Sequence, residues 1–292
     1  MADEGKAADG AGPRAGKNAI VVGGSSGMGK AAAKRFVELG GKVLICSRDD
    51  KKLAKAAAEI GGPPGAVKTH VLDNKDEAQV KAMFEDKDVV QPGFYDALIV
   101  TALGRAPHGN FLDLDVAQAR ETMEGKLWGP WYCAKYGAPH LGDGGAVVFV
   151  SGVLCRRPGE KCTPLASSNG AVEALTRALA LELGPRLRVN CLSPGFVDTE
   201  RFDHLPAERR ANMLEATAAS LPLLRTGQAP ELGEALHFLA TSTFTTGTVL
   251  DCDGGHQVRQ YALPNDLYFR LRRQQEEKRG SGERSRSPVP AG

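Results

Sequence analysis

The sequence predicts an α/β protein whose parallel, doubly wound sheet is covered by helices on both faces. Short runs of β-branched and apolar residues without polar alternation recur along the chain, as is typical of strands buried on both faces. Helical patterns separate these runs, which favours parallel strands joined by crossover helices. In such a sheet, ligands bind at the carboxyl ends of the strands, where the strand order reverses.

The first strand and the turn after it carry the strongest local signal. Residues 20–22 predict a buried strand, a glycine-rich segment spaced G-x-x-x-G-x-G follows at 23–29, and a helix is expected over 30–39. Glycines let the backbone approach an anion closely, and the N-terminus of a helix offers free N–H groups and a positive dipole end. The turn is therefore either a phosphate site or a plain strand-to-helix turn without a ligand.

Arg48 follows the second predicted strand, residues 42–46. In a doubly wound sheet this position faces the adenosine ribose of a bound dinucleotide. A carboxylate there would accept a hydrogen bond from the 2′-hydroxyl of NAD. A cation there would instead form an ion pair with the 2′-phosphate of NADP(H). Arg48 thus indicates NADP(H), unless it is only a surface residue at the start of the helix expected over 49–60.

The third strand, residues 67–72, ends at Asp73 and Asn74. A carboxylate at this place either hydrogen-bonds the adenine amino group or caps the helix that begins near Lys75, and the two roles are compatible.

The remaining elements continue the alternation, with Thr101 directly after the fourth strand and Gly184-Pro185 after the longest helix. Residues 200–229 have no clear pattern and predict a looser region. The predicted strands are 95–100, 147–150, 188–192 and 247–250, and the predicted helices are 115–136, 163–183 and 231–240.

Composition narrows the possible functions. A net charge of +2 over 292 residues does not fit a protein that coats nucleic acid, and no apolar run approaches the ~20 residues that a membrane helix needs. The six cysteines are scattered, which predicts reduced thiols in a cytoplasmic protein and no metal site. Flexible tails are expected at 1–16 and 263–292, around a single domain at 17–262.

Several motifs resemble the short-chain dehydrogenase/reductase family from Lys17 to Val258: V-G-G-S-S-G-M-G, S-P-G-F-V-D-T and T-G-T-V-L-D-C-D-G-G. The resemblance implies a Rossmann-like sheet of seven strands, bound NADP(H), a small-molecule carbonyl or alcohol substrate, and a homodimer or homotetramer. By the same resemblance, two groups of residues would hold the cofactor. The diphosphate and ribose would contact Gly23, Ser25, Ser26, Gly27 and Met28, and the nicotinamide end would contact Pro194, Gly195, Val197 and Thr199.

The chain departs from the family at the catalytic tetrad of Asn, Ser, Tyr and Lys. Alignment puts Leu165 in the Tyr place and Asn169 in the Lys place. Gly152 falls in the Ser place, with Ser151 beside it, and Lys126 replaces the Asn. A leucine cannot transfer a proton, and general acid–base help is worth ~10²- to 10⁴-fold in rate. The sequence therefore predicts a divergent member that lacks the tetrad.

Lys126 is the candidate that replaces the missing acid. A partly desolvated ammonium beside a cationic nicotinamide has a lowered pKa and can act as a general acid or stabilise an oxyanion. Alternatively, Lys126 only binds ribose or a structural carbonyl. Ser151 either orients substrate or satisfies the backbone. Further candidates, each with an ordinary structural alternative, are Cys155, Arg156, Arg157, Cys162, His108 and His204.

Two functions from different classes follow. The first is an NADP(H)-dependent oxidoreductase with a rebuilt acid–base site, favoured by the intact nicotinamide segment. The second is a catalytically inactive NADP(H) sensor or scaffold, favoured by the altered tetrad. A non-redox enzyme that uses the same pocket is a third hypothesis with less support.

Overall fold

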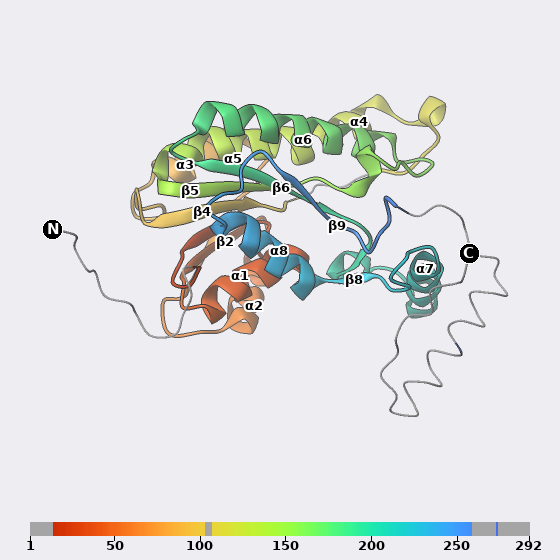
Figure 1. Cartoon of the computed structure of the whole chain (residues 1–292), viewed down its shortest axis with the longest axis horizontal. Helices are drawn as coiled ribbons and strands as arrows, with labels where there is room; N and C mark the ends of the chain where they lie inside the picture. Colours follow the sequence, from red (N-terminus) through yellow and green to blue (C-terminus); the bar gives the residue numbers. More distant parts are fainter. Residues whose placement is uncertain (1–13, 103–106, 259–272, 274–292) are drawn as a thin grey trace.

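The computed structural model describes residues 14–102, 107–258 and 273, and its centre is a seven-stranded parallel sheet (Figure 1). The strand order is β3-β2-β1-β4-β5-β6-β9, which confirms the predicted fold class. The strands are β1 (Ala19–Val22), β2 (Val43–Ser47), β3 (Val67–Val71), β4 (Tyr95–Val100), β5 (Leu141–Val150), β6 (Arg188–Pro194) and β9 (Val249–Cys252).

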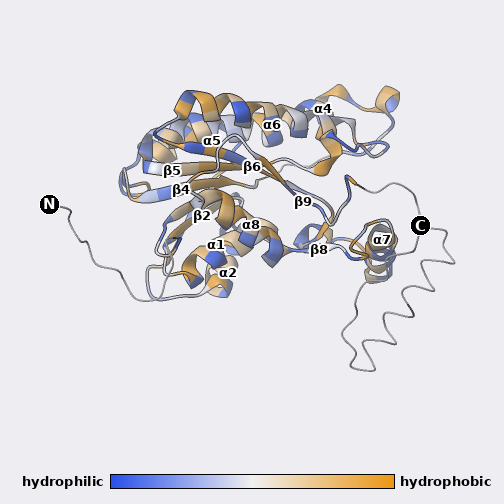
Figure 2. Ribbon diagram, in the orientation of Figure 1, coloured by the Kyte–Doolittle hydropathy of each residue, from blue (hydrophilic) through white to orange (hydrophobic). Residues whose placement is uncertain are grey.

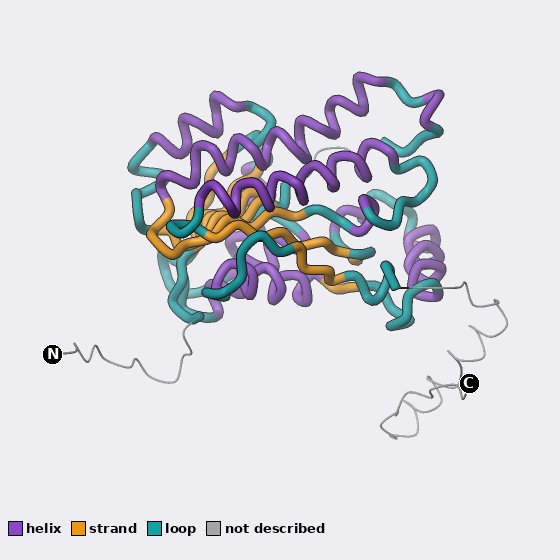
Figure 3. The backbone as a smooth tube through the Cα atoms, turned by 45° about the horizontal axis from the view of Figure 1, so that its top comes forward, coloured by secondary structure: helices purple, strands orange, loops and turns teal. Residues whose placement is uncertain are grey.

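Helices cover both faces of this sheet (Figures 1 and 3). One layer holds α1 (Gly27–Glu38), α2 (Asp50–Ile60) and α8 (Ala229–Thr241), and the other holds α3 (Glu77–Glu85), α4 (Val116–Met123), α5 (Gly129–Gly137) and α6 (Thr163–Leu183). Short 3₁₀ segments are η1 (Phe111–Asp113), η3 (Ala138–His140), η4 (Val153–Cys155) and η5 (Glu200–Phe202).

Strand β1 shows why its residues form a strand buried on both faces. Its side chains alternate between the two cores: Ala19 and Val21 pack with α1, α2 and α8, while Ile20 and Val22 pack with α3, α5 and α6. All four residues of β1 are buried, whereas the edge strand β3 is partly exposed, and the strands in Figure 2 carry hydrophilic as well as hydrophobic stretches. The chain winds outward from β1 in both directions, so the order reverses between β1 and β4, and the ligand crevice is expected at their carboxyl ends.

The helix predicted over 115–136 is interrupted by a π-helical segment, η2 (Glu124–Trp128), between α4 and α5. Single π-turns inside α-helices are rare and occur frequently at functional sites. Lys126 lies in the middle of this segment.

The prediction of a looser region over 200–229 is wrong in part, because helix α7 (Ala207–Ala219) lies within it. None of the α7 residues is buried, so no apolar face marks the helix in the sequence. Two further short strands, β7 (Val197–Asp198) and β8 (Gly227–Gln228), pair beside it. Strand β5 also begins earlier than predicted, and its register with β4 shifts between Tyr95 and Ala97.

The described fold begins inside the segment predicted as an N-terminal tail. Arg14 lies over the Phe238 ring at 4.9 Å, and the Gly16 N–H donates to Leu39 O at 2.8 Å. Residues 1–13 of that tail, and 263–292 apart from residue 273, lie outside the described residues. Among the helices that are described, none is both long and apolar enough to cross a membrane.

Candidate active site

The turn after β1 requires glycine at two positions that face Thr101. Gly23 has a φ of +90°, and a Cβ on it would lie 2.5 Å from Thr101 Oγ1. A Cβ on Gly29 would meet Gly23 O and the same Thr101 hydroxyl. Thr101 in turn donates to the carbonyl oxygens of Val22, at 3.3 Å, and Gly23, at 3.2 Å. The predicted cofactor residue Thr101 thus joins the end of β4 to the glycine turn.

A carboxylate from a distant segment sits on this turn. Glu200 Oε2 accepts a hydrogen bond from the Gly27 N–H at 2.8 Å, and its Oε1 accepts one from Lys30 Nζ at 2.6 Å. Burial alone would raise the pKa of Glu200, but the hydrogen bonds from Lys30 and the backbone hold it below its usual value. The start of α1 therefore binds an anionic oxygen, which is the property that a phosphate site requires.

Arg48 lies at the end of β2 with its side chain exposed. Within the described part of the chain, no hydrogen bond or ion pair engages its guanidinium. Beside it, Ser47 Oγ is buried and has no hydrogen-bond partner there. Helix α2 is capped by Asp49, whose carboxylate accepts from the Lys52 N–H at 3.0 Å, so Arg48 has no part in capping it.

The capping role considered for Asp73 is wrong, because α3 begins two residues later than expected and Asp76 caps it. Asp73 instead accepts a hydrogen bond from the Lys75 N–H at 3.1 Å. Asn74 is buried and its Nδ2 donates to Gly125 O at 3.3 Å, which links the end of β3 to the π-helical segment.

Lys126 points from the π-helical segment to the end of β5. Its side chain is only 4% exposed, and its Nζ donates to Ser151 O at 3.0 Å. Burial lowers the pKa of Lys126 to about 8. A buried amine with a pKa near neutrality can both give and accept a proton under ordinary conditions.

Ser151 is fixed from its other side by Glu173, a residue that the sequence reasoning missed. Ser151 Oγ donates to Glu173 Oε1 at 3.0 Å, and Cys155 Sγ donates to the same oxygen at 3.1 Å. Arg156 Nη2 lies 3.3 Å from that oxygen and also contacts Asp251. The available signal was an acid beside Val172 on the apolar face of the helix at 163–183, where an unpaired charge would be costly.

The same hydrogen-bond network holds the two adjacent arginines, Arg156 and Arg157. Arg156, considered as a ligand for an acidic substrate or as a solvated residue, is tied inward, because its Nη2 also donates to Ser193 Oγ at 2.7 Å. Arg157 Nη1 donates to Gln257 O at 3.3 Å. Arg156 therefore has hydrogen-bond and ion-pair partners within the fold that the sequence did not predict.

Two aligned tetrad positions lie on the buried face of α6. Leu165 is 9% exposed and Asn169 is 2% exposed. Asn169 Oδ1 has no partner among the described residues, and a Cβ on Gly152 would lie 2.9 Å from Asn169 Nδ2. The Asn169 amide therefore lies against the segment that carries Ser151, with one acceptor unused.

The segment after β6 reaches back to the glycine turn. Gly195 packs against Asp253, where a Cβ would lie 2.7 Å from Asp253 Cα, and Val197 is buried. Thr199 lies over the turn, its methyl group 3.4 Å from a Cβ built on Gly27. Pro194 ends β6, so the predicted nicotinamide residues and the predicted phosphate residues meet at one edge of the sheet.

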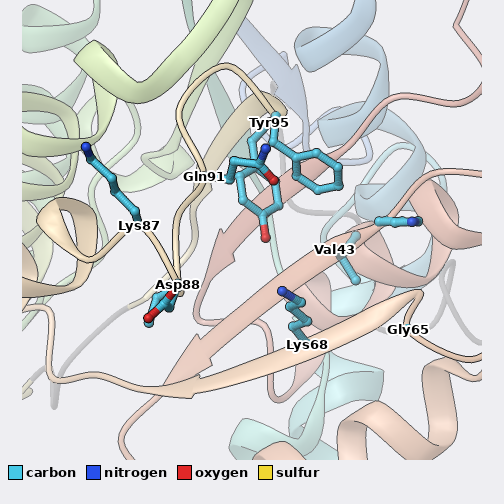
Figure 4. Close-up of a pocket in the computed structure, with 10 residues that line it drawn as sticks. Val43, Gly65, Lys68, Lys87, Asp88, Gln91 and Tyr95 are labelled. Carbon is cyan, nitrogen blue, oxygen red and sulfur yellow. The ribbon is translucent and has the colours of Figure 1, made fainter.

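The two histidine candidates lie outside this cluster. His108 Nδ1 is 3.3 Å from Cys162 Sγ, and His204 Nδ1 contacts Arg201 O at 2.9 Å. A pocket of about 270 Å³ lies at the opposite, amino-terminal ends of β2, β3 and β4, where Figure 4 shows Lys68 and Tyr95 beside it. It shares no residue with the site described above.

The chain is similar to known proteins over most of its length. Residues 22–257 match a family described as Enoyl-(Acyl carrier protein) reductase. L-fucose dehydrogenase of Bos taurus is 34% identical over 251 residues, which cover 84% of this chain and 90% of that protein.

Two solved structures superpose on the chain. A short chain dehydrogenase/reductase family protein has a TM-score of 0.72 at 28% identity and covers 84% of this chain and 99% of its own. A small-chain dehydrogenase in complex with NADPH has a TM-score of 0.70 at 32% identity, with coverages of 83% and 99%.

Proposed function

Because the chain belongs to the short-chain dehydrogenase/reductase family, we propose that it is an NADP(H)-dependent oxidoreductase that interconverts an alcohol and a carbonyl on a small molecule. The observation that carries the proposal is the buried Lys126 amine at the end of β5, with its pKa lowered to about 8. When bound, the nicotinamide supplies the hydride exchange. The chain supplies the binding sites and the proton.

The residues at the strand ends fit a dinucleotide. The anion site at Gly27 and Lys30 already holds a carboxylate, and the unpartnered Ser47 hydroxyl beside Arg48 suits a 2′-phosphate, which supports NADP(H) over NAD. The residues proposed to hold the cofactor are Gly23, Ser25, Ser26, Gly27, Met28, Arg48, Asp73, Asn74, Thr101, Pro194, Gly195, Val197 and Thr199.

Lys126 is proposed to take the place of the tetrad tyrosine, because Leu165 carries no proton. As an ammonium, Lys126 Nζ gives a proton to a carbonyl oxygen during reduction; as a neutral amine, it accepts the hydroxyl proton during oxidation. Ser151 donates its own proton to Glu173, so its lone pairs are left to accept a hydrogen bond from a substrate hydroxyl. Lys126 and Ser151 are thus the proposed catalytic pair.

A second candidate function is an NADP(H)-binding sensor or scaffold without turnover. It is favoured by the hydrogen bond from Lys126 Nζ to Ser151 O, since an amine engaged by a structural carbonyl has one donor fewer for substrate. We also keep the single domain at 17–262, a homodimer or homotetramer and a cytoplasmic location as predictions.

Cofactor titration followed by a turnover assay tests the proposal. NADPH and NADH binding is followed by nicotinamide fluorescence, and NADP⁺ reduction is then assayed with L-fucose, other aldoses and polyols. Steady turnover that falls at least ~100-fold in Lys126→Ala, with NADPH affinity largely kept, supports the oxidoreductase. NADPH binding with no turnover of any substrate in the wild type supports the sensor instead.

A further inference from the structure

Glu200 occupies the place where an anionic ligand of the glycine turn has to bind. Its two carboxylate oxygens take up the Gly27 N–H and the Lys30 ammonium, at 2.8 and 2.6 Å. We infer that Glu200 is a built-in competitor of the cofactor diphosphate, and that the site admits only a ligand whose own anionic group displaces this carboxylate. The inference rests on the proposed nucleotide site and adds a residue that determines what the site accepts.

The start of α1 has no local cap, which explains why a distant carboxylate binds there. The N-cap residue Ser26 makes no side-chain hydrogen bond, and the first turn of the helix carries no acidic residue. Helix N-termini leave free N–H groups and a partial positive charge. Glu200, 173 positions away from Gly27, satisfies one of those N–H groups.

The backbone segment that carries Glu200 is held in place by contacts on both sides of that residue. Arg210 of α7 donates to Asp198 at 2.7 Å and to Asp203 at 2.7 Å, on the two sides of Glu200. The rings of Phe196 and Phe202 stack with centroids 5.1 Å apart. Thr199 of the same segment lies over Gly27, so Glu200 approaches the glycine turn beside a residue of the proposed nicotinamide site.

The expected effect is moderate because Glu200 is partly exposed. Its side chain is 41% exposed and that of Lys30 is 24% exposed. An ion pair and a helix-terminus contact of this kind each contribute modestly at the surface. We therefore expect removal of the carboxylate to tighten NADPH binding about fivefold to tenfold.

Glu59 provides a matched control. It pairs with the same Lys30 ammonium at the same 2.6 Å, and its side chain is 42% exposed. No contact joins it to the Gly27 N–H within the described residues. Glu59→Gln therefore removes the same charge from the same neighbourhood without freeing the anion position.

The experiment measures the NADPH dissociation constant by fluorescence for the wild type, Glu200→Gln, Glu200→Ala and Glu59→Gln at low ionic strength. The expected order is tightest for Glu200→Ala and Glu200→Gln, with Glu59→Gln within about twofold of the wild type. Circular dichroism melts confirm that each variant is folded.

The outcomes separate the inference from the proposed function. If the wild type binds NADPH and the Glu200 variants bind equally or more weakly, the competitor role is overturned and the cofactor site stands. The competitor role is also overturned if Glu59→Gln tightens binding as much as Glu200→Gln, because bulk charge then explains both. If no form binds NADPH, the proposed function fails and the inference fails with it.

Discussion

Replacing Lys126 with methionine tests the physical basis of the proposed proton donor without knowledge of the substrate. Burial lowers the pKa of Lys126 from 10.5 to about 8. Between these two values the unfolded chain binds more protons at Lys126 than the folded protein does. The contribution of Lys126 to the free energy of unfolding therefore rises as the pH increases from 8 to 10.5.

The magnitude follows from the shift. One pKa unit corresponds to about 1.4 kcal/mol, so the buried ammonium costs the fold about 3 kcal/mol below pH 8 and about 1 kcal/mol at pH 10. Relative to Lys126→Met, the wild type should gain about 2 kcal/mol between pH 7 and pH 10, or roughly 4–8 °C in Tm. The lost hydrogen bond to Ser151 O shifts the variant by a similar amount at every pH and cancels from this comparison.

The assay is urea denaturation followed by circular dichroism at pH 7, 8.5 and 10. Lys81→Met is the control, because Lys81 is 52% exposed and pairs with Glu85 across one helical turn. Its stability difference from the wild type should not depend on pH in this way. A wild-type to Lys126→Met difference that stays constant within about 0.5 kcal/mol over the range would refute the lowered pKa, and with it the proton role.

Three further predictions concern the cofactor and the framework around the site. Arg48→Asp should weaken NADPH binding about tenfold or more and reverse the preference for NADPH over NADH, measured by fluorescence titration; an unchanged preference would remove Arg48 from the site. Gly29→Ala should destabilise the protein by about 1–3 kcal/mol in urea melts, because its Cβ would meet Gly23 O, and wild-type stability would contradict that packing. Glu173→Ala should lower the free energy of unfolding by about 2–4 kcal/mol, because it removes a buried carboxylate that pairs with Arg156. Asp251→Ala should lower it less, since Asp251 is 38% exposed and Glu173 only 8%. Equal losses in urea melts of the two variants would contradict this assignment.

The sequence predicted the elements whose buried residues form a local apolar pattern. Strand β1 and helix α6 were found within a residue or two, because their apolar patterns are local and the structure buries them as expected. Helix α7 was missed, because a helix with no buried residue carries no such pattern. Capping of α3 was one of two roles considered for Asp73, and Asp76 performs it instead, since both aspartates lie just before the helix and offer the same chemistry.

The sequence by itself determined the sheet, the glycine turn and the identity of the candidates, because these depend on backbone sterics and on residue type. Only the tertiary structure decided which groups meet. Glu173 reaches Ser151 across 22 positions, and Glu200 reaches Gly27 across 173. Contacts of that separation are set by the order in which parallel strands bring their carboxyl ends to one edge, and no local pattern records which partner a buried or anionic group finds there.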